Sequence, residues 1–138
     1  LFRIRKIHKT YLAIAHGQVD NKIKLLNHNL VVYEKNKKVV QKAISHVRIL
    51  KSNDKFSFLE LKPITGRKHQ LRKQLYYIGN PIVGDNKYFG GIQKGQFKKQ
   101  DLMLHAFKLK FMINNIKYNF EANYSDEFNN FIKRNFKF

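Results

Sequence analysis

Apolar and polar residues alternate most clearly in residues 107–121. Every second position is apolar in residues 107–113 and again in residues 116–121, and Lys or Asn occupies most of the positions between. Alternation of this kind is typical of a half-buried β-strand. Asn114 and Asn115 separate the two runs, and asparagine tolerates the positive φ that a two-residue hairpin turn requires. The pattern therefore predicts two strands joined as a β-hairpin.

Shorter apolar runs predict further strands. In residues 10–15 (TYLAIA), Leu12 and Ile14 face one side while Tyr11 and two alanines face the other, and Gly17 ends the strand. Residues 56–62 (FSFLELK) form another expected strand. Between residues 19 and 50, clusters of Asn and Lys separate short apolar groups, which we expect to be short strands and turns. These groups are Ile23–Leu26, Leu30–Tyr33 and Ala43–Leu50, with a solvated loop at Lys35–Lys38.

A helical period is present within the stretch Leu61–Tyr88. Leu71, Leu75 and Ile78 recur at i, i+4 and i+7 and form one face of a helix, which Gly79 and the proline after it should end. Cations in the first turn of a helix oppose its dipole, so a basic first turn favours an anion docked at that end. The basic side chains around this helix are Arg67, Lys68, His69, Arg72 and Lys73.

A second helix is expected near the C-terminal end. Ser125 can cap it, Asp126 and Glu127 suit its first turn, and basic residues follow towards its last turn. The apolar stripe of this helix should be buried, and it consists of Phe128, Phe131, Ile132 and Phe136. With strands along most of the chain and two helices, residues 1–138 are predicted to form a single α+β domain.

The charge balance narrows the class of partner. The 138 residues include 28 Lys and Arg against 9 Asp and Glu, which gives a net charge of +19 and a pI near 10.2. Such an excess in a short chain points to a polyanionic partner, for which nucleic acid is the usual case. A membrane surface also attracts basic charge, but it needs one amphipathic helix with a concentrated apolar face. Lysines here run through every segment, so nucleic acid is favoured.

Other classes of site lack the residues they need. No cysteine is present, which excludes disulfides and thiolate metal sites, and the six scattered histidines show no metal-binding spacing. No apolar run approaches the roughly 20 residues of a membrane span, and the first ten residues lack the apolar core of a signal peptide. The chain does not begin with Met, so we expect residue 1 not to be the natural start. We expect a cytoplasmic monomer that binds no metal.

Three further features of the sequence carry an expectation about their structural role. Tyr11 has small alanines as neighbours and so has the space that a stacking platform needs, although a half-buried strand tyrosine is the commoner situation. Asp85 follows a glycine in a tight turn, where aspartate is usually structural. Phe89–Asp101 is expected to be a mobile basic loop near the site.

Residues 65–90, TGRKHQLRKQLYYIGNPIVGDNKYFG, resemble a motif of the RluA-type pseudouridine synthases. The family version reads approximately TGR-T-HQ-I/L-R-V-H, then a short helix, G-H-P-I-x-G-D and Tyr-Gly. HKTYLAIAHG resembles the family strand K-x-Y-x-A-x-V-x-G, and MLHAFKLKF resembles L-H-A-x-x-L-x-F. The resemblance extends from Ile7 to about Phe131. It implies the C-terminal half of the pseudouridine synthase fold, a mixed but mainly antiparallel sheet flanked by short helices.

The resemblance also implies roles for individual residues. Tyr11 matches the active-site tyrosine that lies against the flipped target base, and Arg72 matches the arginine that pairs with the catalytic aspartate. Leu104 lies near an apolar contact of the active site. The other basic and polar residues of the motif are candidates to hold the motif together or to contact RNA phosphates. They are Arg67, Lys68, His69, Gln70 and Lys73.

The sequence also departs from the family pattern. Lys68 stands where Thr is usual, and Gln74 and Asn80 stand where His is usual. A larger departure concerns the nucleophilic aspartate, which the family carries in an R-L-D-x-x-T-S-G motif before the tyrosine strand, and which no Asp of this sequence matches. We therefore expect the 138 residues to be inactive alone. We also expect the guanidinium of Arg72 to face an open, solvated cleft.

The function that the resemblance implies is RNA pseudouridine synthesis without a cofactor, on 23S ribosomal RNA or on tRNA. Two alternatives stay open: a non-catalytic RNA-binding module derived from the same family, and a basic domain like those of ribosomal proteins. The last explains the charge but gives no reason for Tyr11 and Arg72 to fall in family register. An Arg-Leu-Asp motif encoded upstream of Leu1 would favour the enzyme.

Overall fold

A computed structural model describes residues 4–89 and 101–137 of the chain. Most of the expected loop Phe89–Asp101 lies outside these residues. The strands are β1 (Ile4–His16), β2 (Leu25–Glu34), β3 (Lys37–Ser52), β4 (Phe56–Pro63), β5 (Leu104–Ile113) and β6 (Ile116–Glu121). The helices are α1 (Gln70–Tyr77) and α2 (Asp126–Asn135). The prediction of an α+β fold is confirmed.

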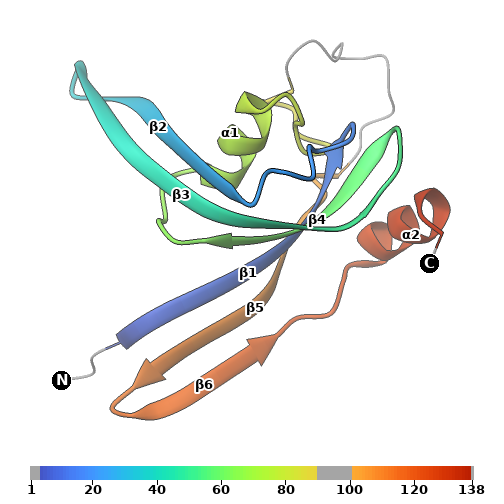
Figure 1. Ribbon diagram of the computed structural model, residues 1–138. Coiled ribbons are helices and arrows are strands. Elements are labelled where there is room, and N and C mark those ends of the chain that lie inside the picture. Colours follow the sequence, from blue (N-terminus) through green and yellow to red (C-terminus); the bar gives the residue numbers. More distant parts are fainter. Residues whose placement is uncertain (1–3, 90–100, 138) are drawn as a thin grey trace.

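The six strands form one sheet in the order β2-β3-β4-β1-β5-β6, and every neighbouring pair is antiparallel (Figure 1). β1 is central because it pairs with β4 on one side and with β5 on the other. Its residues Leu12 to Ala15 are all buried, which shows that side chains cover the sheet on both faces at this point.

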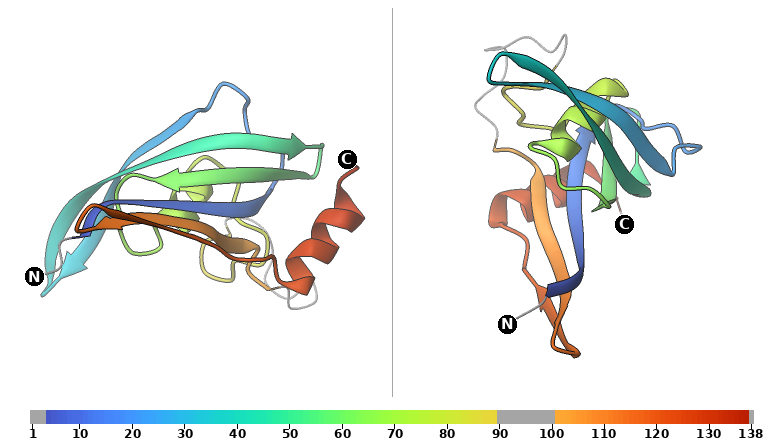
Figure 2. Two further views of the ribbon diagram at one scale, coloured as in Figure 1. Left: turned by 90° about the horizontal axis from the view of Figure 1, so that it is seen from below. Right: turned by 90° about the vertical axis from the view of Figure 1, so that its left-hand side faces the viewer.

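The two helices cover opposite faces of the sheet. Leu61 and Phe58 of β4 are three positions apart along the strand, so their side chains point to opposite sides. On the Leu61 side, α1 is attached to β3 by a hydrogen bond from Ser45 to Gln74. On the Phe58 side, the ring of Phe58 contacts Phe128 of α2 at 6.1 Å between ring centroids. The helices are seen on separate sides of the sheet in Figure 2.

The expectation of short strands between residues 19 and 50 is wrong. β2 and β3 are continuous strands of 10 and 16 residues, joined by the two-residue turn Lys35–Asn36 with φ of 48° and 64°. Asn27 and Asn29, which resembled strand breaks, occupy exposed positions along β2. Because one face of this hairpin is solvated, polar residues fit every second position without interrupting the ladder.

The expected C-terminal hairpin is confirmed. β5 and β6 pair in the expected register about Asn114 and Asn115, whose φ values are 48° and 68°. β5 begins three residues before the alternating run, at Leu104, which brings that residue into the sheet beside β1. Phe111 of β5 stacks on Tyr118 of β6, with ring centroids 5.2 Å apart and planes 13° apart.

The C-terminal helix is also confirmed. The hydroxyl of Ser125 accepts a hydrogen bond from the N–H of Phe128, as expected of an N-cap. All four residues of the expected apolar stripe are buried in the core. No helix within residues 4–89 and 101–137 is long and apolar enough to cross a membrane.

Candidate active site

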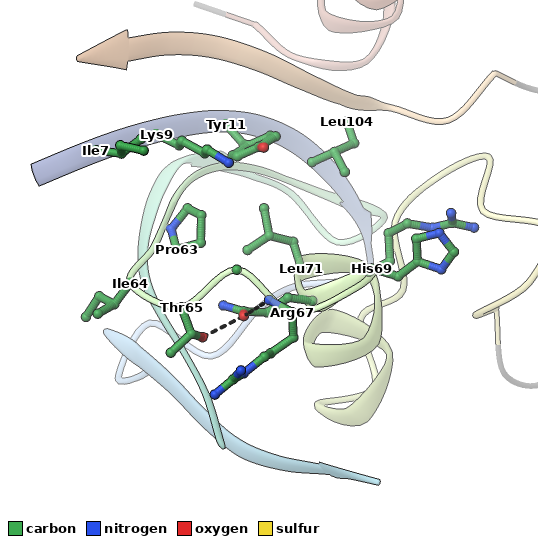
Figure 3. A pocket seen from close by; sticks show the side chains of 13 residues that line it. Ile7, Lys9, Tyr11, Pro63, Ile64, Thr65, Arg67, His69, Leu71 and Leu104 are labelled. Carbon is green, nitrogen blue, oxygen red and sulfur yellow. Dashed lines mark hydrogen bonds between the residues drawn. The ribbon is translucent and has the colours of Figure 1, made fainter. Parts of the chain in front are cut away.

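A cavity of about 370 Å³ lies on the α1 side of the sheet, between β1, β5, the first turn of α1 and the loop before it. Figure 3 shows Tyr11 on β1 and Leu104 on β5 at one side of the cavity, with Leu71 of α1 across from them. The cavity brings together most of the residues singled out from the sequence. Those that line it are Tyr11, Arg67, His69, Gln70, Arg72 and Leu104.

Tyr11 packs partly against the core, but its ring has no stacking partner among the described residues. Its cross-strand partners are Leu61 on β4 and Ala106 on β5, and the small side chain of Ala106 leaves space on one side. No other residue of the described chain stacks on this ring or forms a hydrogen bond with its hydroxyl. The half-buried tyrosine therefore presents an unoccupied aromatic surface to the cavity, as stacking of a base would require.

The loop before α1 is held by Gln70, the first residue of the helix. Its Oε1 accepts hydrogen bonds from the hydroxyl of Thr65 at 2.6 Å and from the N–H of Arg67 at 3.0 Å. Its Nε2 donates to the carbonyl of Ile44 at 3.1 Å and to the hydroxyl of Ser45 at 2.8 Å. All four hydrogen-bonding positions of this buried amide are filled. Of its two expected roles, the structure supports holding the motif together and leaves no group for RNA.

Gln74, one turn further along α1, completes this attachment. Its Oε1 accepts from the hydroxyl of Ser45 at 2.6 Å, while its Nε2 donates to the carbonyls of Leu26 at 3.3 Å and Ala43 at 3.0 Å. Its side chain is fully buried. The departure from the family pattern at this position thus serves to join α1 to β2 and β3.

The N-terminus of α1 has unusual geometry. His69 is the N-cap residue and has a left-handed backbone, with φ of 53° and ψ of 31°, and it forms no side-chain cap. Its Nδ1 lies 3.1 Å from the hydroxyl of Tyr88, so the ring turns towards the turn that follows the helix. Burial lowers the pKa of His69, and the nearby charges of Arg72, Lys87, Lys68 and Lys73 lower it further. The neutral imidazole is therefore favoured at this end of the helix.

Arg72 does not face an open, solvated cleft, and that expectation is wrong. Its Nε donates to Oδ2 of Asp85 at 2.8 Å and its Nη2 donates to Oδ1 at 2.7 Å, which makes a bidentate pair. The Asp85 side chain is fully buried and the Arg72 side chain is 17% exposed. The guanidinium also lies over the ring of Tyr88, 5.2 Å from its centroid. Asp85 can reach Arg72 because Gly79 ends the helix, and the chain then turns back past it.

The pair shifts the pKa of both groups. Its hydrogen bond with Asp85 raises the pKa of Arg72 above its ordinary value, although burial acts in the opposite direction. Burial alone would raise the pKa of Asp85, but the hydrogen bonds from Arg72 and from the backbone N–H groups of Tyr88 and Lys87 outweigh it, so its pKa is lowered. Both groups are therefore charged at neutral pH.

Asp85 is the residue of this site that sequence reasoning missed. Its turn role was foreseen, since Oδ1 accepts from the N–H groups of Lys87 and Tyr88 at 2.9 Å each. The ion pair with Arg72 was not foreseen, because 13 residues and an end of helix separate the two. The signal in the sequence that could have indicated this ion pair was a single acidic residue close to a helix rich in cations.

The pairing leaves one end of Arg72 available. Nε and Nη2 are occupied by Asp85, whereas Nη1 has no hydrogen-bond partner among residues 4–89 and 101–137. Because a guanidinium carries five N–H donors in a rigid plane, Arg72 can donate to a second anion while its pair with Asp85 holds it in place.

Of the remaining basic residues, Arg67 lines the Tyr11 cavity, whereas Lys68 and Lys73 do not. Arg67 donates from Nε to the carbonyl of Lys42 on β3 at 3.0 Å. Lys68 and Lys73 line a second cavity on the other side of Gly66 and Arg67, which contribute to both cavities. The predicted site residues thus divide between two adjoining cavities. No three His, Asp or Glu side chains of the described residues come together in a way that could hold a metal ion.

Comparison with known proteins identifies the family. The model of the RNA pseudouridylate synthase family matches residues 1–77, which include Tyr11 and Arg72. The chain belongs to this family, and the RluA-type resemblance drawn from its motifs is confirmed. It is similar to the ribosomal large subunit pseudouridine synthase D of Borreliella burgdorferi, with 36% identity over 116 residues, which cover 79% of this chain and 35% of the relative.

Other relatives and solved structures agree with this assignment. The tRNA pseudouridine synthase C of Vibrio cholerae is 30% identical over 135 residues, covering 81% of this chain and 55% of the relative. The structure of human RNA pseudouridylate synthase domain containing 4 superposes with a TM-score of 0.74 at 22% identity, over 93% of this chain and 62% of that one. At that identity the superposition shows a shared fold. The chain spans roughly a third to a half of the length of these curated relatives.

Proposed function

We propose that the gene product carrying this chain is an RNA pseudouridine synthase, and that ribosomal large subunit RNA is its first substrate to test, with tRNA second. The observation that supports this most directly is that one cavity is lined by Tyr11, Arg72 and Leu104 together. These are the three positions to which the family resemblance gave active-site roles. They come from β1, α1 and β5, so the fold and not sequence proximity assembles them.

In the proposed reaction the target uridine leaves its stack, at a cost of a few kcal/mol, and enters the Tyr11 cavity. The ring of Tyr11 stacks against the base, and Leu104 and Leu71 supply apolar contacts that exclude water. An aspartate attacks the nucleotide, and the glycosidic C–N bond breaks. The base turns and bonds to the sugar through carbon, the bond to the aspartate breaks, and the ring carbon loses a proton while the freed ring nitrogen gains one. No aspartate of this sequence lies in the family's motif, so we propose that the nucleophile comes from outside residues 1–138.

Arg72 would hold the nucleophilic carboxylate through Nη1. Because Asp85 already neutralises much of its charge, Arg72 would lower the pKa of a second carboxylate less than a lone arginine would. Its main contribution would be orientation, since the bidentate pair with Asp85 fixes the plane of the guanidinium. This differs from an isolated charge pair, in which the nucleophile would be the only partner.

A second candidate is a non-catalytic RNA-binding module. One observation favours it: Asp85 balances the charge of Arg72 within the chain, so the cation needs no external carboxylate as a counter-ion. Both candidates use the Tyr11 cavity to hold a base, but only the enzyme changes that base.

Mapping pseudouridines tests the proposal. Ribosomal RNA and tRNA from cells that carry or lack the gene are compared, and the deletion strain is complemented with wild-type, Tyr11→Phe or Tyr11→Ala protein. We expect at least one pseudouridine to vanish on deletion, to return with the wild type and largely with Tyr11→Phe, and to return weakly with Tyr11→Ala, since stacking contributes about 1–3 kcal/mol. Identical maps with and without the gene would reject the enzyme and leave the binding module.

A further inference from the structure

The second cavity, of about 500 Å³, adjoins the Tyr11 cavity at Gly66 and Arg67. Its walls come from the tip of the β2–β3 hairpin, the start of α1 and the turn after Asp85. Four cationic side chains face it, together with two tyrosines: Arg67, Lys68, Lys73, Lys87, Tyr33 and Tyr88. Glu34 is the one acidic residue among those that line it.

The positive charges of the three lysines are not balanced by nearby carboxylates. Among residues 4–89 and 101–137, no carboxylate lies within ion-pair distance of Lys68, Lys73 or Lys87. Asp85, the nearest buried acid along the chain, is occupied by Arg72. Burial lowers the pKa of Lys73, and the charges of Lys87 and Lys68 lower it further. The folded protein therefore tolerates a repulsion that an anion in the cavity would relieve.

The position of the lysines is fixed by the same network that builds the Tyr11 cavity. Lys68 and Lys73 lie on either side of the N-terminus of α1, where the helix dipole adds positive potential. The N–H of Lys87 donates to Oδ1 of Asp85, which anchors the turn that carries this lysine. The exposed ring of Tyr33 (72% exposed) stands at the rim. A cationic cavity with aromatic rings beside it fits a single nucleic-acid strand, whose phosphates and bases need both.

We propose that the second cavity binds the phosphate backbone of the RNA strand next to the nucleotide held in the Tyr11 cavity. The inference rests on the proposed function, because it takes RNA as the substrate. The strand would pass Gly66 and Arg67, which line both cavities, and the space beside Gly66 is open, since a Cβ there would meet nothing within 4 Å. Lys73 and Lys87 are then phosphate-binding residues, and the resemblance had marked only the first of them.

Salt dependence of RNA binding tests the site. The complete gene product and its Lys73→Gln/Lys87→Gln double variant are titrated with oligouridylate and with ribosomal RNA at several salt concentrations. Each lost phosphate contact on a single strand should reduce the slope of log affinity against log salt by about 0.7. We therefore expect the double variant to bind several-fold more weakly and with a smaller slope.

The matched control is Lys22→Gln/Lys24→Gln, which removes the same charge from two exposed residues that precede β2, at the end away from the cavity. Its salt slope should change less than that of the Lys73→Gln/Lys87→Gln variant. Equal slopes for the two double variants would overturn the proposal, since a general loss of charge would then explain the effect. Weaker binding to polyglutamate with unchanged RNA binding would also overturn it, in favour of an acidic protein partner.

A stability measurement distinguishes a phosphate-binding role of Lys73 from a role in packing. In the absence of RNA, Lys73→Gln should raise the midpoint of thermal unfolding, because it removes repulsion from Lys68 and Lys87. A lower midpoint with an unchanged salt slope would show that Lys73 serves packing and would overturn the site. If the wild type forms no pseudouridine but the slope still falls, the phosphate site stands and the enzymatic proposal fails.

Discussion

The two helices of this protein follow opposite rules. α2 begins with a serine cap, has Asp126 and Glu127 in its first turn and has Lys133 and Arg134 in its last turn. α1 begins with a left-handed His69, has no side-chain cap and has no acidic residue in its first turn. α2 buries phenylalanine and isoleucine, whereas α1 buries Gln70 and Gln74 beside two leucines.

The difference suggests an experimental comparison of the two helices. The cap and the charges of α2 stabilise it locally, and its buried side chains belong to the core. α1 is unfavourable locally and is held instead by hydrogen bonds to β2, β3 and the preceding loop. A segment that violates the capping and charge rules, and is compensated by tertiary contacts, is where a functional site is expected. The experiments below test whether α1 serves function and α2 stability.

The largest effect is expected for Arg72→Lys in α1. Lysine keeps the charge but cannot hold Asp85 with two bonds and offer a third donor in the same plane. Misplacing a group at the reacting centre by about 1 Å can reduce turnover on the order of a hundredfold. We expect a loss of that size in single-turnover pseudouridine formation by the complete gene product, with RNA affinity nearly unchanged.

The same substitution in the other helix provides the control. Arg134 of α2 is exposed, and within the described part of the chain it donates only to the carbonyl of Asn130, at 3.4 Å. Arg134→Lys should leave turnover at the wild-type level. If Arg72→Lys also kept near wild-type turnover, Arg72 would have no role in the reaction and the contrast between the helices would be one of structure alone.

The next effect is on stability, for Asp85→Asn. Removing one partner of a buried ion pair leaves the other charge uncompensated, at a cost of about 3 kcal/mol in the free energy of unfolding. The pKa of Asp85 is lower in the folded chain than in the unfolded chain. Its stabilisation is therefore complete above the ordinary carboxyl pKa and is lost as the pH falls through the folded value. The difference between wild type and Asp85→Asn, measured by urea unfolding, should shrink as the solution becomes acidic.

A more exposed ion pair serves for comparison. Glu60 accepts from Arg48 at 3.1 Å, and the side chains of Arg48 and Glu60 are 68% and 18% exposed. Glu60→Gln should change the free energy of unfolding by less than about 1 kcal/mol. A difference between wild type and Asp85→Asn that stayed constant down to acidic pH would mean that the pKa of Asp85 is not lowered by folding.

The sequence was sufficient for the parts of the fold that depend on local rules. The hairpin about Asn114 and Asn115 and the helix capped by Ser125 formed as predicted, because turn, cap and periodic residues agree there. The same reasoning failed for β2 and β3. Exposed asparagines and lysines in a solvated hairpin look like loop residues, and only pairing with a neighbouring strand shows that they lie in a ladder.

For the candidate site, the family resemblance indicated Tyr11, Arg72 and Leu104, and the structure places all three around one cavity. Three features needed the three-dimensional arrangement. Asp85 pairs with Arg72 only because the chain turns back after Gly79, and the amide of Gln70 is occupied by hydrogen bonds to β3. The left-handed His69 could not be foreseen, since histidine has no preference for that conformation comparable to that of glycine.

The smallest effects compare the two helix N-caps directly. Ser125→Ala removes the hydroxyl that accepts from the N–H of Phe128, and we expect it to lower the free energy of unfolding by about 1 kcal/mol. His69→Gly should not lower it. A left-handed non-glycine residue costs about 1–2 kcal/mol, and glycine removes this strain. The loss of the bond between His69 and Tyr88, of about 1 kcal/mol, opposes the gain.

His69→Ala isolates the backbone contribution, because it removes the same ring but keeps the Cβ, and it should be less stable than His69→Gly. Urea unfolding with unchanged m-values provides the measurement. If Ala and Gly at position 69 were equally stable, the left-handed N-cap would be unstrained, and α1 would differ from α2 in charge but not in backbone.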